Sequence, residues 1–446
     1  MRKSIVVTFI LLVFISTANS QETWTLERCI EYALTNNIQV KQQELNVKVS
    51  EVNLLQSKMD ALPTLNLSAN HSYSFGLVTN YVTNTKEALN TQATSYSLST
   101  GIPIYNGLQL TNSRKQNQFN LKASVADVES VKNDIALTIA SLYLQILYQQ
   151  ELVEVEKRQV ELSEMQLSRT KVLVEAGSLP EGNLYEVEAL LASDELQLVN
   201  AQNQLTLSYL NLTQLLELKS TEGFYIEKPV IPEVDSVMLM TENPVQIFKT
   251  AEEIMPQIQS ARFKLQSSEL GLRIARGGLQ PRLSLGANYN SGAQYRIQDS
   301  YDFTGDPFFT QIKDNSSKSV GLSLSIPIFN GLSARNRVST ARIGLMNSQL
   351  ALESERNALY KNIQQAYTDA VAAEKKLQAS HKSKAASEES FRYTESKFNI
   401  GLVTALDYTT AKNKLAQAEN DLLQAKYELI FKIKILEFYK GMPLKL

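Results

Sequence analysis

The chain has 446 residues, of which 43% are apolar and 20% are charged, so it holds enough apolar side chains to fold around a core. Its formal net charge is −2, and without a surplus of Lys and Arg a nucleic-acid partner has no support. One cysteine, Cys29, and two histidines, His71 and His381, cannot supply a disulfide, a metal-ligand cluster or a nucleophile with its base. We therefore expect no enzyme, no metal and no cofactor.

The N-terminus has the pattern of a secretory signal peptide over residues 1–20. It begins with Met1-Arg2-Lys3, continues with an apolar run over 5–15 and ends in the small residues Ala18-Asn19-Ser20. A retained membrane anchor is the alternative, but the run is shorter than the ~20 residues that a spanning helix needs. The mature protein is expected to start near Gln21 without an acylated cysteine, because the only cysteine lies well past this point.

A first repeat is predicted over residues 21–217. Apolar side chains recur every three or four positions over 24–62, which predicts a helix that Pro63 ends. Strands are predicted at 64–75 and 94–104, where apolar residues alternate with Ser, Asn and Gly, and Pro103 marks the exit of the second strand.

The longest predicted helix of this repeat covers 109–176. It carries an apolar residue at every seventh position, which predicts a coiled-coil seam along a rod on the order of 100 Å long; the ladder is Ile139, Ile146, Val153, Val160, Leu167 and Val174. Gly177 is suited to end the rod, because the residue after a helix often takes a positive φ. A returning helix is predicted over 181–217.

A second copy of this pattern follows the linker 218–243. Residues 98–108 and 322–332 agree at eight of eleven positions, and the same offset of 224 continues through the long helix, which predicts an internal twofold repeat. The second repeat is predicted over 244–440, with helix 244–279, strands 282–291 and 317–328, long helix 333–400, helix 405–440 and a C-terminal tail 441–446. Pro281 and Pro327 flank its strands as Pro63 and Pro103 flank those of the first copy.

The four strands have the length and the two-faced pattern of a transmembrane barrel wall. Four strands cannot close, and an open edge in lipid leaves backbone groups unpaired at several kcal/mol each, so closure requires further copies of the chain. A soluble two-layer domain is the alternative, in which the apolar strand faces pack on helices. A secreted coiled-coil adhesin or stalk is a rival from another class, although it leaves the paired strands unexplained.

These features together resemble the TolC family of outer-membrane efflux proteins, and the resemblance covers the whole mature chain. It rests on the twofold repeat, the proline junctions, the Ile-Pro-Ile-aromatic-Asn-Gly exits and the segment Phe398-Asn-Ile-Gly-Leu-Val-Thr-Ala-Leu-Asp407. The implied fold is mainly α with membrane β: a long antiparallel helical barrel in the periplasm joined to an oligomeric transmembrane β-barrel. The implied function is the exit duct of a tripartite efflux system in the outer membrane, or the outlet of a type I protein-secretion system.

The resemblance also implies the partners. These are two further copies in a homotrimer, outer-membrane lipid, a periplasmic adaptor of the membrane fusion type, and an inner-membrane pump of the RND or ABC type. Drugs, metal ions and polypeptides remain equally compatible as cargo, because the residues predicted to line the conduit do not identify the transported molecule.

A periplasmic gate is implied at Asp407, Phe398 and Asn183. The chain departs from the family pattern here, since Phe398 replaces a tyrosine, Val403 an arginine and Thr410 a second aspartate, so an apolar closure is also compatible. The alternative role for Asp407 is to start a helix, where a carboxylate complements the helix dipole.

The two turns are the predicted docking tip for the adaptor. Exposed apolar residues at the end of a rod suggest a contact surface, although the local core of a helical hairpin is an alternative. The predicted docking residues are Gly177, Ser178, Leu179, Gly401, Leu402 and Val403.

Overall fold

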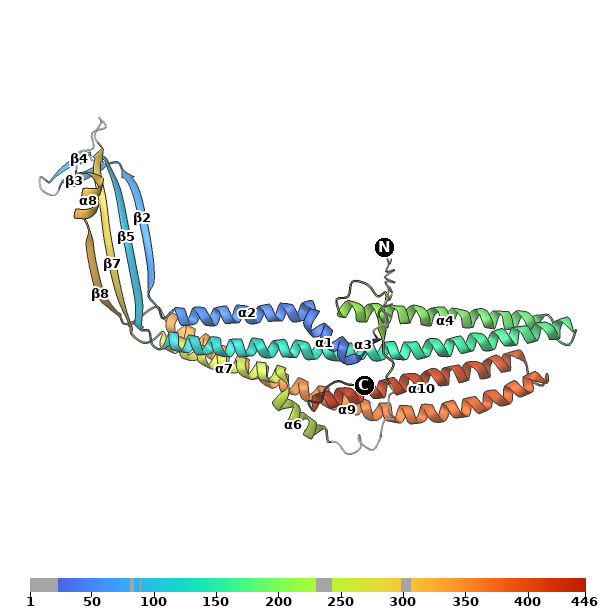
Figure 1. Cartoon of the computed structure of the whole chain (residues 1–446). Coiled ribbons are helices and arrows are strands. Elements are labelled where there is room, and N and C mark those ends of the chain that lie inside the picture. Colours follow the sequence, from blue (N-terminus) through green and yellow to red (C-terminus); the bar gives the residue numbers. More distant parts are fainter. Residues whose placement is uncertain (1–22, 81–83, 89, 230–242, 298–305) are drawn as a thin grey trace, which may run out of the picture. The chain divides into compact units, whose positions relative to one another are not determined.

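The computed structural model describes residues 23–80, 84–88, 90–229, 243–297 and 306–446. The chain forms two compact units that are interleaved in the sequence (Figure 1). Among the described residues, unit 1 comprises 23–42, 130–229, 243–254 and 359–446, and unit 2 comprises 43–80, 84–88, 90–129, 255–297 and 306–358. The two longest helices, α3 (Gln109–Glu175) and α9 (Ser333–Asn399), contribute to both units. The predicted signal peptide lies outside the described residues.

Unit 2 contains a four-stranded antiparallel sheet in the order β2-β5-β7-β8 (Figure 1). Its strands are β2 (Thr64–Ser74), β5 (Asn90–Tyr105), β7 (Arg282–Ile297) and β8 (Ser317–Ser325). The central strands β5 and β7 extend beyond the predicted 94–104 and 282–291, because their ends, where the alternation of apolar and polar residues fades, still pair through their main chains, as Asn90 does with Ile297. Strand β8 ends before the predicted 328, ahead of Pro327, which has no N–H to donate to a ladder.

A two-stranded ribbon and a short helix complete the sheet region of unit 2. Strands β3 (Leu77–Asn80) and β4 (Thr85–Ala88) pair antiparallel in a separate ribbon. Helix α8 (Phe308–Asp314) is fixed to β7, because the side-chain Nδ2 of Asn315, the residue after the helix, donates to Gly292 O at 2.8 Å.

The helical part of unit 2 is joined by short hydrogen bonds between neighbouring helices. The hydroxyl oxygens of Ser50 in α2 (Ile38–Met59) and Ser124 in α3 lie 2.8 Å apart. Those of Ser268 in α7 (Pro256–Gly277) and Ser348 in α9 lie 2.6 Å apart. Such short side chains let two helix backbones approach each other closely.

Two predicted helices are each divided in two. The predicted helix 24–62 consists of two helices, α1 (Leu26–Asn36) and α2. They are separated at Asn37, whose buried side chain forms hydrogen bonds with the backbone at the break. Its Nδ2 donates to Leu215 O at 3.0 Å and its Oδ1 accepts from Gln39 N at 2.8 Å. The predicted helix 244–279 consists of α6 (Pro244–Ile254) and α7, and Pro256 occupies the first turn of α7, where its missing N–H costs nothing.

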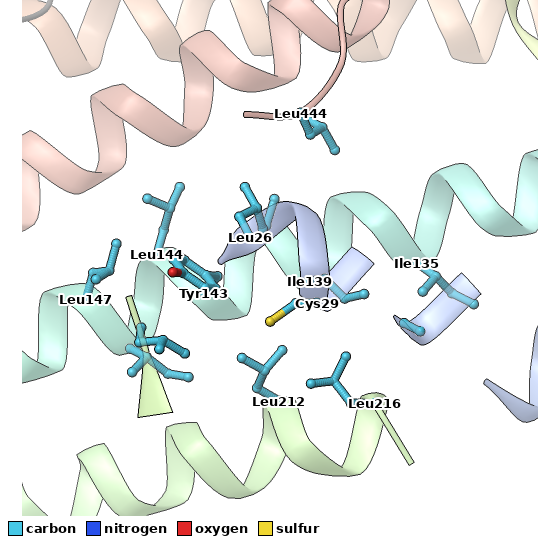
Figure 2. Packing of buried hydrophobic residues seen from close by; sticks show 14 of the residues in the cluster. Leu26, Cys29, Ile135, Ile139, Tyr143, Leu144, Leu147, Leu212, Leu216 and Leu444 are labelled. Carbon is cyan, nitrogen blue, oxygen red and sulfur yellow. The ribbon is translucent and has the colours of Figure 1, made fainter. Parts of the chain in front are cut away.

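The core of unit 1 lies where α1 packs between α3 and α4 (Gly182–Leu215), as Figure 2 shows. Cys29, Ile139 and Leu212 are fully buried there. Burial raises the pKa of the Cys29 thiol to about 12, so this cysteine stays protonated and acts as a small apolar side chain.

The segment after α4 is fixed to the same core. Its strand β6 (Tyr225–Ile226) pairs parallel with β1 (Thr23–Trp24). The hydroxyl of buried Tyr143 lies 3.0 Å from Trp24 O and 2.7 Å from Glu227 O. The first part of the predicted linker 218–243 is therefore ordered against α3, and residues 230–242 lie outside the described residues.

The predicted fold class, long antiparallel helices with four membrane-type strands, agrees with this architecture. The returning helices are α4 and α10 (Ala405–Tyr439), each joined to a long helix by a short turn. The closed barrel and the twofold structural repeat stay predictions.

Candidate functional site

The sheet of unit 2 has one apolar and one polar face. The register aligns Leu67, Leu98 and Tyr289 in one row across three strands, and Lys318 of β8 continues this row. The neighbouring row, which points to the opposite face, is entirely polar and contains Asn66, Ser99, Asn288 and Ser319. Leu67 is 72% exposed and Leu322 is 66% exposed. An exposed apolar face of this kind is typical of a barrel wall in lipid.

Both outer strands of this sheet are open on one side. Within the described sheet β2 pairs only with β5, and β8 pairs only with β7. The backbone N–H and C=O groups on the outer sides of β2 and β8 are consequently available to another strand.

The four predicted junction prolines lie at the ends of the strands. Pro63 and Pro281 directly precede β2 and β7, and Pro327 follows the last residue of β8 by two positions. Pro103 lies within β5 opposite Ser284, and the register shifts between it and Tyr105. A proline cannot donate to the ladder, so these positions limit the pairing where strands meet helices.

A glycine pair joins the start of α3 to the end of α7. Gly107 has a φ of +67°, and a Cβ on it would lie 2.2 Å from Gly277 O. A Cβ on Gly277 would lie 2.4 Å from Gly107 O. Next to them, Gln109 Nε2 donates to Ile274 O at 3.0 Å. The sequence predicted the Asn-Gly exit at Gly107. Nothing in the sequence indicated that Gly277, 170 residues away, would contact it.

The first turn, at the end of α3, is closed by backbone hydrogen bonds. Gly177 has a φ of +68°, and Ser178 N donates to Leu173 O at 2.8 Å. This is a Schellman-type ending, which satisfies carbonyls at the helix end. Leu179 is half-buried, whereas Gly177 and Ser178 are exposed.

The second turn, at the end of α9, is more apolar. Gly401 has a φ of +77°, and Leu402 N donates to Lys397 O at 2.9 Å. Leu402 is 70% exposed and Val403 is half-buried. The predicted docking residues thus form two turns of the same backbone type, and the second of them presents a large exposed aliphatic side chain.

The predicted gate residues have separate partners. Asp407 and Thr404 form a capping box at the start of α10, in which Asp407 N donates to Thr404 Oγ1 at 3.2 Å and Thr404 N donates to Asp407 Oδ2 at 3.0 Å. The hydrogen bonds from Thr404 lower the pKa of the Asp407 carboxyl. Phe398 packs on Tyr408 with ring centroids 4.9 Å apart, and Asn183 N donates to Pro180 O. The helix-start role of Asp407 is therefore present, and a role in a gate stays a prediction.

A buried polar cluster that was not predicted from the sequence joins three helices of unit 1. Lys412 of α10 is only 2% exposed, and its Nζ donates to Gln159 O at 3.0 Å, to Ser163 Oγ at 2.6 Å and to an Asp194 carboxylate oxygen. Gln159 and Ser163 belong to α3 and Asp194 to α4. Burial lowers the pKa of Lys412, and Asp194 opposes this shift by favouring the charged form.

One signal in the sequence could have revealed this cluster. Ala405, Tyr408 and Lys412 are spaced by three and four, so they share one face of α10, and all three are buried. A lysine on an otherwise inward face predicts a buried acidic partner, but the sequence does not say which carboxylate supplies it.

Among the helices that the structure describes, none is both long and apolar enough to be a candidate membrane span.

Comparisons with known proteins agree with these features. The family profile described as "Outer membrane efflux protein" matches residues 29–217 and 248–432. Outer membrane protein TolC of Escherichia coli is 22% identical over 388 residues, which cover 84% of this chain and 73% of that protein.

Solved structures share the fold over nearly the whole chain. The outer membrane protein VceC from Vibrio cholerae superposes with a TM-score of 0.78 at 17% identity and covers 94% of this chain and 96% of its own. The MtrE outer membrane channel of Neisseria gonorrhoeae, in its open state, gives a TM-score of 0.72 at 18% identity over 94% of this chain and 90% of its own. Because the profile matches most of the sequence, this chain belongs to the outer membrane efflux protein family, and it is an efflux channel of the outer membrane with a periplasmic helical tunnel rather than an enzyme.

Proposed function

We propose that three copies of this chain close one transmembrane barrel and one periplasmic tunnel. The observation that carries this proposal is the sheet of unit 2, with its exposed apolar face and its two open edges. In lipid the open edges of β2 and β8 leave backbone groups unpaired at several kcal/mol each, and pairing β8 of one copy with β2 of the next removes this cost. The number three comes from the resemblance to the family.

The oligomer can be tested directly in detergent. We expect the purified protein to be a trimer by light scattering coupled to size exclusion, and to give single-channel currents in a planar lipid bilayer. A monodisperse monomer that retains its strand content by circular dichroism would contradict the proposal, because four strands alone leave both edges bare.

The trimer is the exit duct of a tripartite assembly, in which a periplasmic adaptor docks on the turns and an inner-membrane pump supplies the cargo. The proposed docking residues are those of the two turns, with Leu402 at their centre because it is 70% exposed and lies at a tight turn. Exposed aliphatic side chains at such a position favour burial against another protein.

A double substitution tests the docking site. Leu402→Asp with Val403→Asp places charge in an apolar contact, where desolvation of the carboxylates opposes binding. We expect export and adaptor co-purification to be lost while trimer formation is unchanged. Val172→Asp is the matched control, since Val172 is 62% exposed on α3 outside the proposed docking residues and should retain export. Normal export by the double variant would show that the second turn is not the docking site.

The gate belongs to the same end of the tunnel, at Asp407, Phe398 and Asn183. Asp407 is exposed at the start of α10, so three copies bring three carboxylates near the tunnel axis if the turns converge. Asp407→Asn should then shift ion selectivity away from cations. Unchanged selectivity would leave Asp407 with its capping role alone.

A further inference from the structure

The charges of the sheet in unit 2 have one sign. Strands β2, β5, β7 and β8 contain no Asp or Glu. On the polar face of these strands the ionisable side chains are Arg282, the first residue of β7, and Arg296 near its other end. The rest of this face is made of Ser, Thr, Asn, Gln, Gly, Ala and Pro. A conduit lined by this face has no negative charge at the level of the strands.

Three of the four chain segments next to the sheet continue this pattern, whereas the fourth, at the end of α2, carries Asp60 beside Lys58. Residues 106–126, 270–281 and 326–352 also lack Asp and Glu. Exposed cations occur in all three segments, and they are Arg114, Lys115, Lys122, Arg273, Arg276, Arg335, Arg337 and Arg342. These three segments of the strand-to-helix junction of unit 2 therefore form a positively charged zone.

One cavity within this zone is lined by two arginines. It has a volume of about 600 Å³, and its lining includes Gln109, Arg282, Ser325, Asn330 and Arg337. Arg282 is the first residue of β7 and Arg337 is the fifth residue of α9, so two elements supply one charge each. The cavity lining contains no carboxylate.

The register shows which side of the sheet the cavity adjoins. Arg282 is paired with Ser325, and it alternates with Ser284 and Gly286 on the polar face. Both Arg282 and Ser325 line the cavity, so the cavity adjoins the polar face, and Arg337 lines the same cavity. In a barrel whose apolar face contacts lipid, this is the side of the lumen.

The chemistry of the cavity selects oxyanions. A guanidinium group offers a planar fork of donors that matches phosphate and carboxylate oxygens, and two such groups without a competing carboxylate attract an anion more strongly than one. Ser333 and Ala334 at the start of α9 also line the cavity, where the positive end of the helix dipole adds to the attraction.

We propose that Arg282 and Arg337 form an anion-selective ring in the export conduit, and that the cargo is a small molecule bearing phosphate, sulfonate or carboxylate groups. This inference rests on the proposed function, because the lumen exists only in the closed oligomer. Each subunit contributes one such pair at the same level, and rings of Arg or Lys are the arrangement that selects anions in pores.

Reversal potentials in a planar bilayer under a potassium chloride gradient test the ring. The unaltered trimer is expected to prefer chloride, and Arg282→Gln with Arg337→Gln should lower the chloride-to-potassium permeability ratio roughly fivefold. Arg342→Gln is the matched control, because it removes an exposed charge from the same helix outside the cavity. An equal shift in the control and in the double variant would overturn the assignment to the cavity.

Block by inorganic phosphate provides a second readout. Phosphate added to the unaltered trimer should reduce its single-channel current, and the double glutamine variant should lose this block. Arg282→Lys with Arg337→Lys should keep the selectivity but weaken the block, because an ammonium group lacks the bidentate fork. Channels that conduct normally but show neither chloride preference nor phosphate block would overturn the ring alone, whereas a chain that forms no channel at all would overturn the proposed trimer with it.

Discussion

The two helical hairpins of unit 1, α3 with α4 and α9 with α10, have the same backbone design but different polar contacts. Both long helices have 67 residues, and both end in a glycine with a left-handed φ, +68° at Gly177 and +77° at Gly401. The returning helices begin differently, because α10 has the capping box of Thr404 and Asp407, whereas Glu181 before α4 makes no side-chain capping bond. Equal backbone geometry therefore does not require equal side-chain chemistry.

The buried Lys412 cluster is a second and larger difference in side-chain contacts between the two hairpins. At the offset of 224 between the sequence copies, Lys412 corresponds to Glu188 and Asp194 to Ala418. The corresponding residues, Glu188 and Ala418, cannot form an ion pair with each other, so the ion pair between α10 and α4 is not repeated by the sequence duplication. In the proposed trimer, we expect the contact between the two hairpins of one chain to be stiffer than the equivalent contact between neighbouring chains.

The largest expected effect comes from breaking this cluster. Lys412→Met leaves Asp194 buried without a counter-charge, which should lower the free energy of unfolding by about 3–5 kcal/mol. Denaturant unfolding followed by circular dichroism measures this loss. Lys414→Met, two residues along on the exposed side of α10, should change stability by less than ~0.5 kcal/mol. A double variant, Lys412→Met with Asp194→Leu, should recover most of the loss, and a further decrease would contradict the pairing.

The glycine turns should respond alike, which sharpens the comparison. Gly177→Ala and Gly401→Ala should each cost about 1–2 kcal/mol, because a Cβ is unfavourable at a left-handed φ. A Cβ at either position would have nothing within 4 Å, so the cost is that of the backbone conformation alone. Thermal unfolding of the two variants measures it. Gly182→Ala, at a helical position, should be neutral or stabilising, and a clear difference between the two turn variants would show that one turn carries contacts that the other lacks.

The smallest effect is expected at the caps. Thr404→Ala removes the side chain that accepts from Asp407 N, and it should cost about 1 kcal/mol. Glu181→Ala at the equivalent place before α4 should be nearly neutral, since it removes no cap. Urea unfolding of both variants tests the difference, and equal losses would mean that the capping box contributes nothing to the stability of the second hairpin.

Periodicity in the sequence predicted the fold class, and the family confirms it together with the outer-membrane channel function. The heptad ladder gave a long helix over 109–176, and α3 covers Gln109–Glu175. Alternation gave the four strands because a two-faced strand repeats every second residue. Family membership also sets aside the coiled-coil adhesin. The signal peptide, the gate and the docking tip stay predictions.

What the sequence could not supply were contacts between distant residues. Pro256 was visible and could have divided the predicted helix 244–279, but the break at Asn37 depends on Leu215, which only the packed core brings near. Lys412 likewise finds Asp194 across 218 residues, and Gly277 finds Gly107 across 170. Local periodicity reports which face is buried, whereas the partner on that face is decided by how the helices pack.

The open edges of β2 and β8 also have a genetic consequence. In the proposed trimer each copy pairs through two edges, and the ring cannot close when a single edge is defective. A subunit with a proline in the middle of β8 would therefore prevent closure of every ring that it enters. If half of the subunits carried such a change and assembly were random, roughly one trimer in eight would contain only intact copies. Mutations that damage an edge strand should therefore be dominant in cells that still carry an unaltered copy, whereas mutations that prevent the chain from folding should be recessive.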